Sequence, residues 1–154
     1  MIRTLEPIIS KQPFFHGLEE RHIAFVAGCA KNVRFDEGQI IFREGESADE
    51  FYLIREGLVS IEATVPHKGS VTVHTVSAGE MLGWSWLFPP HHWRFQARTQ
   101  KATRALAFDG KCLRTKCEKD HDLGYELLKR FSHVLTERLE STRVQLLDIY
   151  GTSH

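Results

Sequence analysis

The chain has 154 residues, enough for one domain with a buried core that needs no disulfides to fold. Twenty basic and twenty acidic residues cancel, so the chain lacks the excess positive charge on which nucleic-acid binding depends. No apolar run approaches the roughly 18 residues of a membrane span, and the apolar part of the N-terminus is too short for a secretory signal. These properties predict a cytoplasmic protein that does not span a membrane, with a single domain over residues 1–154.

Three cysteines, Cys29, Cys112 and Cys117, are an odd number and lack the paired spacing of a disulfide framework. We therefore expect reduced thiols, which are typical of cytoplasmic proteins. Cys112 and Cys117 lie five positions apart and would not share a face of a helix, so both are expected to be packing thiols.

Residues 5–30 have apolar side chains at three- and four-residue spacing, which predicts a short N-terminal helical cap. Short apolar runs separated by glycine-containing turns follow and indicate strands. The predicted strands cover residues 33–35, 39–43, 50–55, 58–64, 71–76, 94–99 and 103–108. The last two are expected to pair with each other. Strands of this length and spacing predict a jelly roll, called the β-roll below, over about residues 33–109.

Two helices are predicted after the β-roll, over about residues 110–150. Asp109 is expected to cap the first, and Asp120 or Asp122 the second, which runs to about Tyr150. Roughly 27 residues give a helix of about 40 Å, longer than one small β-roll can cover. We therefore expect a homodimer through an apolar stripe on this helix, although the helix could instead pack wholly on its own β-roll. The stripe comprises Phe131, Leu135, Leu139, Leu146 and Tyr150.

The segment from Phe35 to Ile61 resembles the cyclic-nucleotide-binding domain of the catabolite-activator and kinase-regulatory-subunit superfamily. The matching positions are Phe35, Gly38, Ile41, Glu44, Gly45, Glu46, Tyr52, Ile54, Gly57 and Val59. The resemblance implies a mostly β fold, a double-stranded β-helix with an N-terminal helical cap and a long C-terminal helix.

The resemblance also implies a non-catalytic regulatory or sensor domain. Such a domain binds a cyclic nucleotide (cAMP or cGMP) or a related anionic ligand and signals through its C-terminal helix to a protein partner that the sequence does not identify. Transcription factors of the superfamily continue into a helix-turn-helix, for which the four residues after Tyr150 leave no room. We therefore expect no direct DNA binding by this chain.

In the superfamily, a phosphate-binding segment follows the turn at Gly79. Its backbone N–H groups and an arginine hold the cyclic phosphate, and a glutamate accepts a hydrogen bond from the ribose hydroxyl. Gly83 and Ser85 keep their family places, whereas Trp84 stands where the glutamate is expected. Arg94 falls at the arginine position, with Arg98 as the fallback, and Phe95 replaces the Ser or Thr that follows. The candidate ligand-binding residues are therefore Gly83, Trp84, Ser85, Arg94 and Phe95.

The three tryptophans lie between positions 84 and 93 and leave two interpretations open. They could form an aromatic wall that stacks a planar ligand. Alternatively, they could fill a degenerate pocket, and the chain would then be a protein-interaction module that no longer binds nucleotide. Loss of the glutamate acceptor costs about 1–3 kcal/mol, which weakens nucleotide binding roughly 5- to 150-fold.

Neither a metal site nor an active site is expected, and no cofactor is required. The side chains of His91 and His92 diverge because the two residues are adjacent, and no carboxylate or cysteine lies at ligand spacing from them. An enzyme of the cupin type would need a His-x-His motif, which does not occur. Glu44 and Glu46 belong to a turn of the β-roll.

Overall fold

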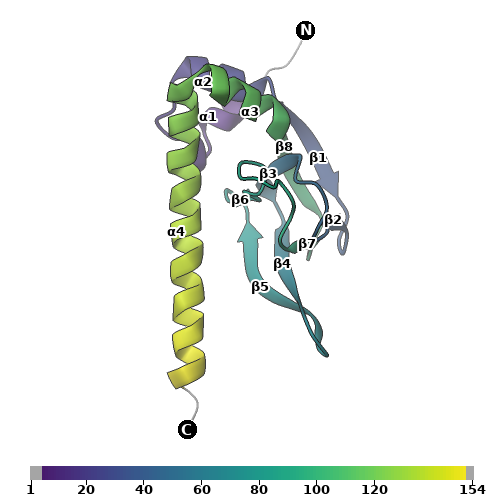
Figure 1. Ribbon diagram of the computed structural model, residues 1–154. Helices are drawn as coiled ribbons and strands as arrows, with labels where there is room; N and C mark the ends of the chain where they lie inside the picture. Colours follow the sequence, from purple (N-terminus) through teal and green to yellow (C-terminus); the bar gives the residue numbers. More distant parts are fainter. Residues whose placement is uncertain (1–4, 152–154) are drawn as a thin grey trace.

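Two four-stranded antiparallel sheets form the β-roll in a computed structural model that describes residues 5–151 (Figure 1). The first sheet has the order β1 (Ala30–Phe35), β8 (Thr103–Asp109), β3 (Glu50–Glu56) and β6 (Met81–Leu82). The second has the order β2 (Ile40–Phe42), β7 (Gln96–Thr99), β4 (Leu58–Val65) and β5 (Gly69–Ser77). The predicted fold class, a mostly β jelly roll with flanking helices, is confirmed.

The predicted pairing of the last two strands with each other is wrong. β7 pairs with β2 and β4 in one sheet, whereas β8 pairs with β1 and β3 in the other, so the chain changes sheets between Thr99 and Thr103. β7 also begins at Gln96, which leaves Arg94 and Phe95 in the preceding segment. β6 was not predicted because its two residues are too few to show an alternating pattern.

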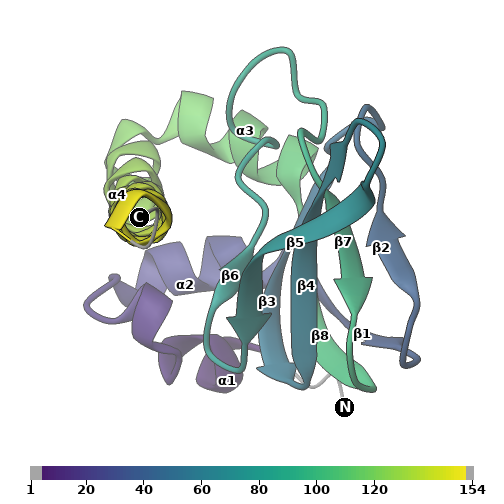
Figure 2. The ribbon, with the colours of Figure 1, turned by 90° about the horizontal axis from the view of Figure 1, so that it is seen from below.

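The helices gather at one end and one side of the β-roll, as Figure 2 shows from below. They are α1 (Glu6–Ser10), a short 3-10 helix (Pro13–Phe15), α2 (Glu20–Ala27), α3 (Gly110–Lys119) and α4 (His121–Gly151). The Asp109 carboxylate accepts a hydrogen bond from the backbone N–H of Cys112 at 3.1 Å, and thus caps α3 as predicted. Asp120, not Asp122, caps α4, because its carboxylate accepts the N–H of Leu123 at 3.2 Å.

Alternating residues of the central strands separate two apolar cores, because successive side chains of a strand point to opposite faces. On β3, Phe51 and Leu53 face the helices, whereas Tyr52 and Ile54 face the interior of the β-roll. Phe131 of α4 joins the helical core, with its ring centroid 5.3 Å from that of Phe51. This core therefore connects α4 directly to the sheet.

The long helix extends well past the part of the molecule that covers it (Figure 1). Its 31 residues span about 46 Å. Its buried side chains, Leu123, Leu127 and Phe131, all lie in the N-terminal half. In the other half Leu139 is 71% exposed and Tyr150 is 70% exposed. The expectation that one β-roll cannot cover this helix is thus confirmed, while the homodimer inferred from it stays a prediction. Phe131, expected in the homodimer stripe, is instead buried in the helical core of its own chain.

The expectation of three reduced thiols is wrong, because Cys29 and Cys112 form a disulfide. Their Cα atoms lie 6.0 Å apart although 83 positions separate them in the chain, so their spacing in the sequence gave no sign of it. Cys117 keeps a free thiol. Burial, with help from the nearby Asp120 carboxylate, raises the pKa of this thiol to about 11, as expected of a thiol that packs rather than reacts.

Candidate functional site

The five candidate residues lie together, where the chain leaves β6 and returns to β7. They line one small pocket with four apolar neighbours: Phe42, Ile61, Leu82 and Trp93. The cavity has a volume of about 20 Å³, room for about one water molecule. Pockets that hold small organic ligands measure roughly 300–1,000 Å³, so the site is closed in this conformation.

The side chain of Trp93 forms a wall of the pocket. It is only 6% exposed, and its ring stacks on Phe42 with 3.8 Å between centroids and 9° between planes. Trp93 is absent from the candidate residues chosen from the sequence. The clustering of the tryptophans was the available signal, but it did not show which ring enters the β-roll.

Gly83 makes room for this ring. Its φ is +94°, which side-chain-bearing residues rarely adopt, and a Cβ atom there would lie 2.6 Å from the ring of Trp93. Glycine is therefore required twice at this position, by the backbone and by the neighbouring indole. Gly83 keeps the glycine position of the family's phosphate-binding segment, and in this chain the same residue packs closely against Trp93.

The backbone of the segment before β7 is tied to the turn after β2. Trp93 donates its N–H to the carbonyl of Glu46 at 2.9 Å and accepts the N–H of Gly45 at 2.8 Å. Ala48 donates to the carbonyl of His91 at 2.7 Å. The turn that carried the family resemblance thus also holds Trp93 in place.

The two arginines considered for the phosphate have different environments. Arg98 is engaged, because its Nε lies 3.4 Å from a Glu62 carboxylate oxygen that also accepts a hydrogen bond from Gln96 at 2.7 Å. Arg94 is exposed at the pocket, and no carboxylate of residues 5–151 forms an ion pair with it. Arg94 is therefore the cation available to an anionic ligand.

The three tryptophans do not form a single aromatic wall. Trp84 and Trp93 line the pocket, whereas Trp86 is fully buried in the helical core. The ring of Trp86 stacks on Phe51 at 4.5 Å and meets Phe131 of α4 edge-on at 5.4 Å. The segment from Gly83 to Trp93 thus contacts the pocket on one side and α4 on the other.

Within the described part of the chain, no group of three or more His, Cys, Asp or Glu side chains is placed to hold a metal ion. None of the helices described between residues 5 and 151 is long and apolar enough to cross a membrane.

Comparison with protein families gives a match between residues 32–120 and the family described as the cyclic nucleotide-binding domain. The CRP-like cAMP-activated global transcriptional regulator of Mycobacterium tuberculosis is 28% identical over 148 residues. That alignment covers 96% of this chain and 64% of the regulator, so the chain spans less than two-thirds of this relative. The cAMP-dependent protein kinase regulatory subunit of Schizosaccharomyces pombe is 28% identical over 78 residues, 51% of this chain and 18% of the subunit.

Solved structures share the architecture. A candidate cyclic nucleotide-binding protein of Geobacter metallireducens GS-15 superposes with a TM-score of 0.79 at 27% identity, covering 90% of this chain and 99% of that protein. The catabolite activator protein of Thermus thermophilus superposes with a TM-score of 0.70 at 20% identity, covering 90% of this chain and 63% of that protein. The second likeness shows the fold alone.

Proposed function

Because this chain belongs to the cyclic nucleotide-binding domain family, we propose that it is a non-catalytic regulatory domain whose output element is α4. We further propose that its ligand is a cyclic nucleotide or a related anion, which must displace Trp93 to enter. One observation carries this proposal: the ring of Trp93, stacked on Phe42, lines the same pocket as the candidate ligand-binding residues, and the cavity of about 20 Å³ is too small for a nucleotide. The expected cytoplasmic location remains part of the proposal.

The pocket keeps groups suited to an anion. Arg94 offers an exposed guanidinium at the edge of the pocket, where it can pair with a phosphate as a charge-assisted hydrogen-bond donor. Trp84 cannot accept the ribose hydroxyl that a glutamate would accept. We therefore expect binding to be weak, because the ligand loses this acceptor and must also break the contact between Trp93 and Phe42.

The segment that carries Trp93 also offers a route to α4. Trp86 lies seven positions before Trp93, its ring contacts Phe131 of α4, and its carbonyl accepts a hydrogen bond from Arg114 of α3. Movement of Trp93 out of the pocket would shift this segment and so change the contact between Trp86 and α4. The exposed residues Leu139, Leu146 and Tyr150 are proposed to form the homodimer contact on that helix.

A second candidate is a protein-interaction module whose pocket stays closed. The hydrogen bonds that tie Trp93 to Gly45 and Glu46 favour it, because they hold the segment firmly in the closed position. In this case a bound protein partner, and not a small ligand, would change the position of α4.

Titration calorimetry with cAMP and with cGMP separates the two candidates. Trp93→Ala should open the pocket and tighten binding at least tenfold over wild type. Arg94→Ala, made in the Trp93→Ala background, should reverse this gain. Phe88→Ala is the matched control, because Phe88 is an exposed aromatic residue of the same segment outside the pocket. If Trp93→Ala melts cooperatively but binds neither cAMP nor cGMP, the result rules out the nucleotide-binding domain and supports the protein-interaction module.

A further inference from the structure

The disulfide between Cys29 and Cys112 is a covalent connection between the two helical parts of the molecule. Cys29 lies between the end of α2 at Ala27 and the start of β1 at Ala30. Cys112 lies in the first turn of α3, and α3 leads directly into α4 through Asp120. The bond therefore fixes the start of α3 against the end of α2.

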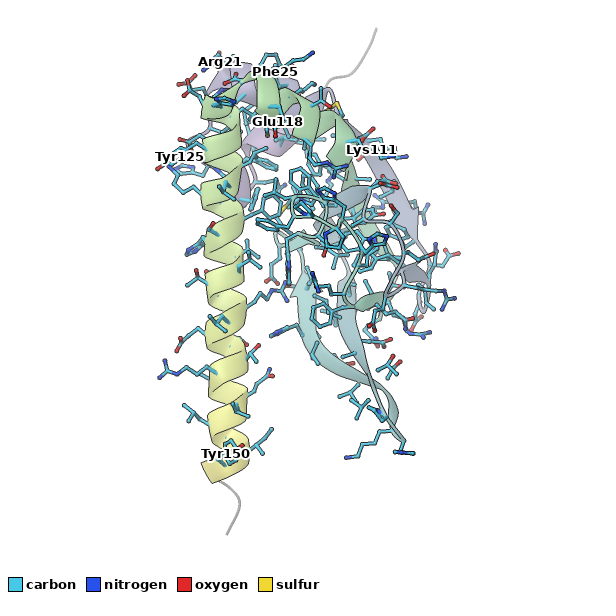
Figure 3. The ribbon with its side chains drawn as sticks, in the orientation of Figure 1. Arg21, Phe25, Lys111, Glu118, Tyr125 and Tyr150 are labelled. Atoms are coloured by element: carbon cyan, nitrogen blue, oxygen red, sulfur yellow. A yellow bond between two sulfur atoms is a disulfide. The ribbon has the colours of Figure 1, made fainter. Side chains whose placement is uncertain are left out.

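The bond lies beside a surface groove of about 470 Å³ that both cysteines line. The groove also contains Lys31 and Lys111, whose ammonium groups lie 3.9 Å from Glu50 and 3.8 Å from Asp49. Cys29 is only 8% exposed and Cys112 is half-buried, so the groove offers a thiol reductant an approach from the side of Cys112. Lys111 is labelled in Figure 3 near the start of α3, and Glu118 near its end.

The first turn of α3 is already capped where Cys112 lies. The backbone N–H of Cys112 donates to the Asp109 carboxylate at 3.1 Å, and the N–H of Gly110 donates to the carbonyl of Asp49 at 2.8 Å. Cys112 is half-buried, whereas Cys29 is 8% exposed, so an incoming thiolate meets the sulfur of Cys112 first.

Other contacts hold α3 in place when the covalent bond is absent. At its start, Asp109 donates its N–H to the carbonyl of Cys29 at 2.8 Å. At its end, Lys116 donates to the carbonyl of Phe25 at 2.7 Å, and Arg21 pairs with Asp120 at 2.9 Å. Arg21 and Phe25 are labelled at this end in Figure 3. Cleavage of the disulfide therefore loosens the first turn of α3 without removing its other contacts.

We propose that Cys29 and Cys112 are a site of reversible oxidation that responds to dithiol reductants. A thiolate of the reductant attacks one sulfur of the pair, forms a mixed disulfide and releases the other cysteine as a thiolate, which takes up a proton. The second thiol of the reductant then displaces the remaining cysteine, and the reductant leaves as a disulfide. Two electrons and two protons pass to the protein, which gains two thiols. Disulfides in reducing compartments are usually redox-sensing or catalytic in this way.

The consequence lies in the first turn of α3. Since Lys116 and Asp120 keep their contacts with α2, the end of α3 stays in place and the loosening is confined to its start. This effect does not depend on nucleotide binding, so it can be tested independently of the function proposed above.

Thiol counting by mass spectrometry tests the site. Protein purified without reductant, unfolded and treated with N-ethylmaleimide should carry one label, on Cys117. Native protein treated with dithiothreitol first should carry three, and oxidised glutathione should restore one. Three labels before reduction would show that no bond forms. One label after native reduction would show a purely structural disulfide. Either result overturns the proposal.

Thermal melting and hydrogen exchange supply the second readout. Reduction should lower the Tm of wild type by roughly 5–15 °C and speed amide exchange in the first turns of α3. Cys29→Ser should melt like the reduced wild-type protein, and its Tm should not change when the reductant is added. Cys117→Ser is the matched control and should keep the full response. Equal exchange in α3 before and after reduction would contradict the proposed loosening.

Discussion

The ring of Trp93 lies flat on the ring of Phe42, 3.8 Å away, inside the β-roll. This stack joins the segment before β7 to strand β2 and completes the interior core. Stability and ligand access are therefore opposed in this protein, because the ring that completes the core is also a wall of the small pocket. Substitutions around Trp93 should affect the two properties in opposite directions.

Gly83→Ala should destabilise the fold by about 2–4 kcal/mol. The cost combines a strained backbone at φ +94° with a Cβ atom placed 2.6 Å from the Trp93 ring. Gly69→Ala is the control, because Gly69 also has a positive φ (+76°) but a Cβ atom added there would meet no other atom within 4 Å. It should cost only about 1–2 kcal/mol. Urea unfolding measures both values, and equal costs would show that Trp93 does not press on Gly83.

The sequence was sufficient for the features that depend on local pattern. Glycine-separated apolar runs predicted the strands of the β-roll, and Asp109 was correctly identified as the cap of α3. All five candidate ligand residues were brought together in one pocket. The strand and cap predictions are confirmed because turn chemistry, strand alternation and helix capping act over a few neighbouring residues, whereas ligand binding by the five residues stays a prediction.

Features that depend on residues far apart in the chain were missed. Cys29 and Cys112 are separated by 83 positions, so only the fold shows that they meet. The entry of Trp93 into the β-roll depends likewise on Phe42, which belongs to another strand. Nothing in the spacing of the three tryptophans shows that Trp86 and Trp93 enter different cores.

Leu139→Asp should convert the protein from a dimer to a monomer. Leu139 is 71% exposed on α4, and a carboxylate buried in a helix–helix contact is costly. We expect dimer affinity to fall at least about 100-fold, equivalent to about 2.7 kcal/mol. Sedimentation at tens of micromolar protein measures the change.

Ser141→Asp is the matched control for this prediction. It adds the same charge two positions along α4, about 200° around the helix and hence on the opposite face. It should leave the dimer intact. A wild-type protein that sediments as a monomer under these conditions would refute the homodimer.

The contact between α4 and β5 should weaken in acid. Thr142 Oγ1 lies 3.2 Å from His74 Nε2, and partial burial together with the nearby Arg138 lowers the pKa of His74 below its usual 6.5. The unfolded chain therefore takes up this proton first. The stability involved is present above about pH 6.5 and is lost as the pH falls through the lower folded value.

His74→Gln should remove this part of the pH dependence, which solvent screening limits to under about 1 kcal/mol. Melting curves between about pH 5 and pH 8 measure it. His67→Asn, in the exposed turn between β4 and β5, is the control and should melt with the wild-type pH profile. Identical profiles for wild type and His74→Gln would rule out a role for this histidine.

Trp84→Glu should restore nucleotide affinity once the pocket is open. Trp84 lines the pocket at the position where the family places its ribose-binding glutamate, and it is only half-buried, so a carboxylate there remains partly hydrated. In the Trp93→Ala background we expect cAMP to bind about 1–3 kcal/mol more tightly, the value of one hydrogen bond to a charged acceptor. The variant Trp84→Gln, which has the shape of glutamate but lacks its charge, should gain less. Calorimetry that finds Glu and Gln equivalent would show that the ribose hydroxyl does not reach position 84, and would place any bound nucleotide in another orientation.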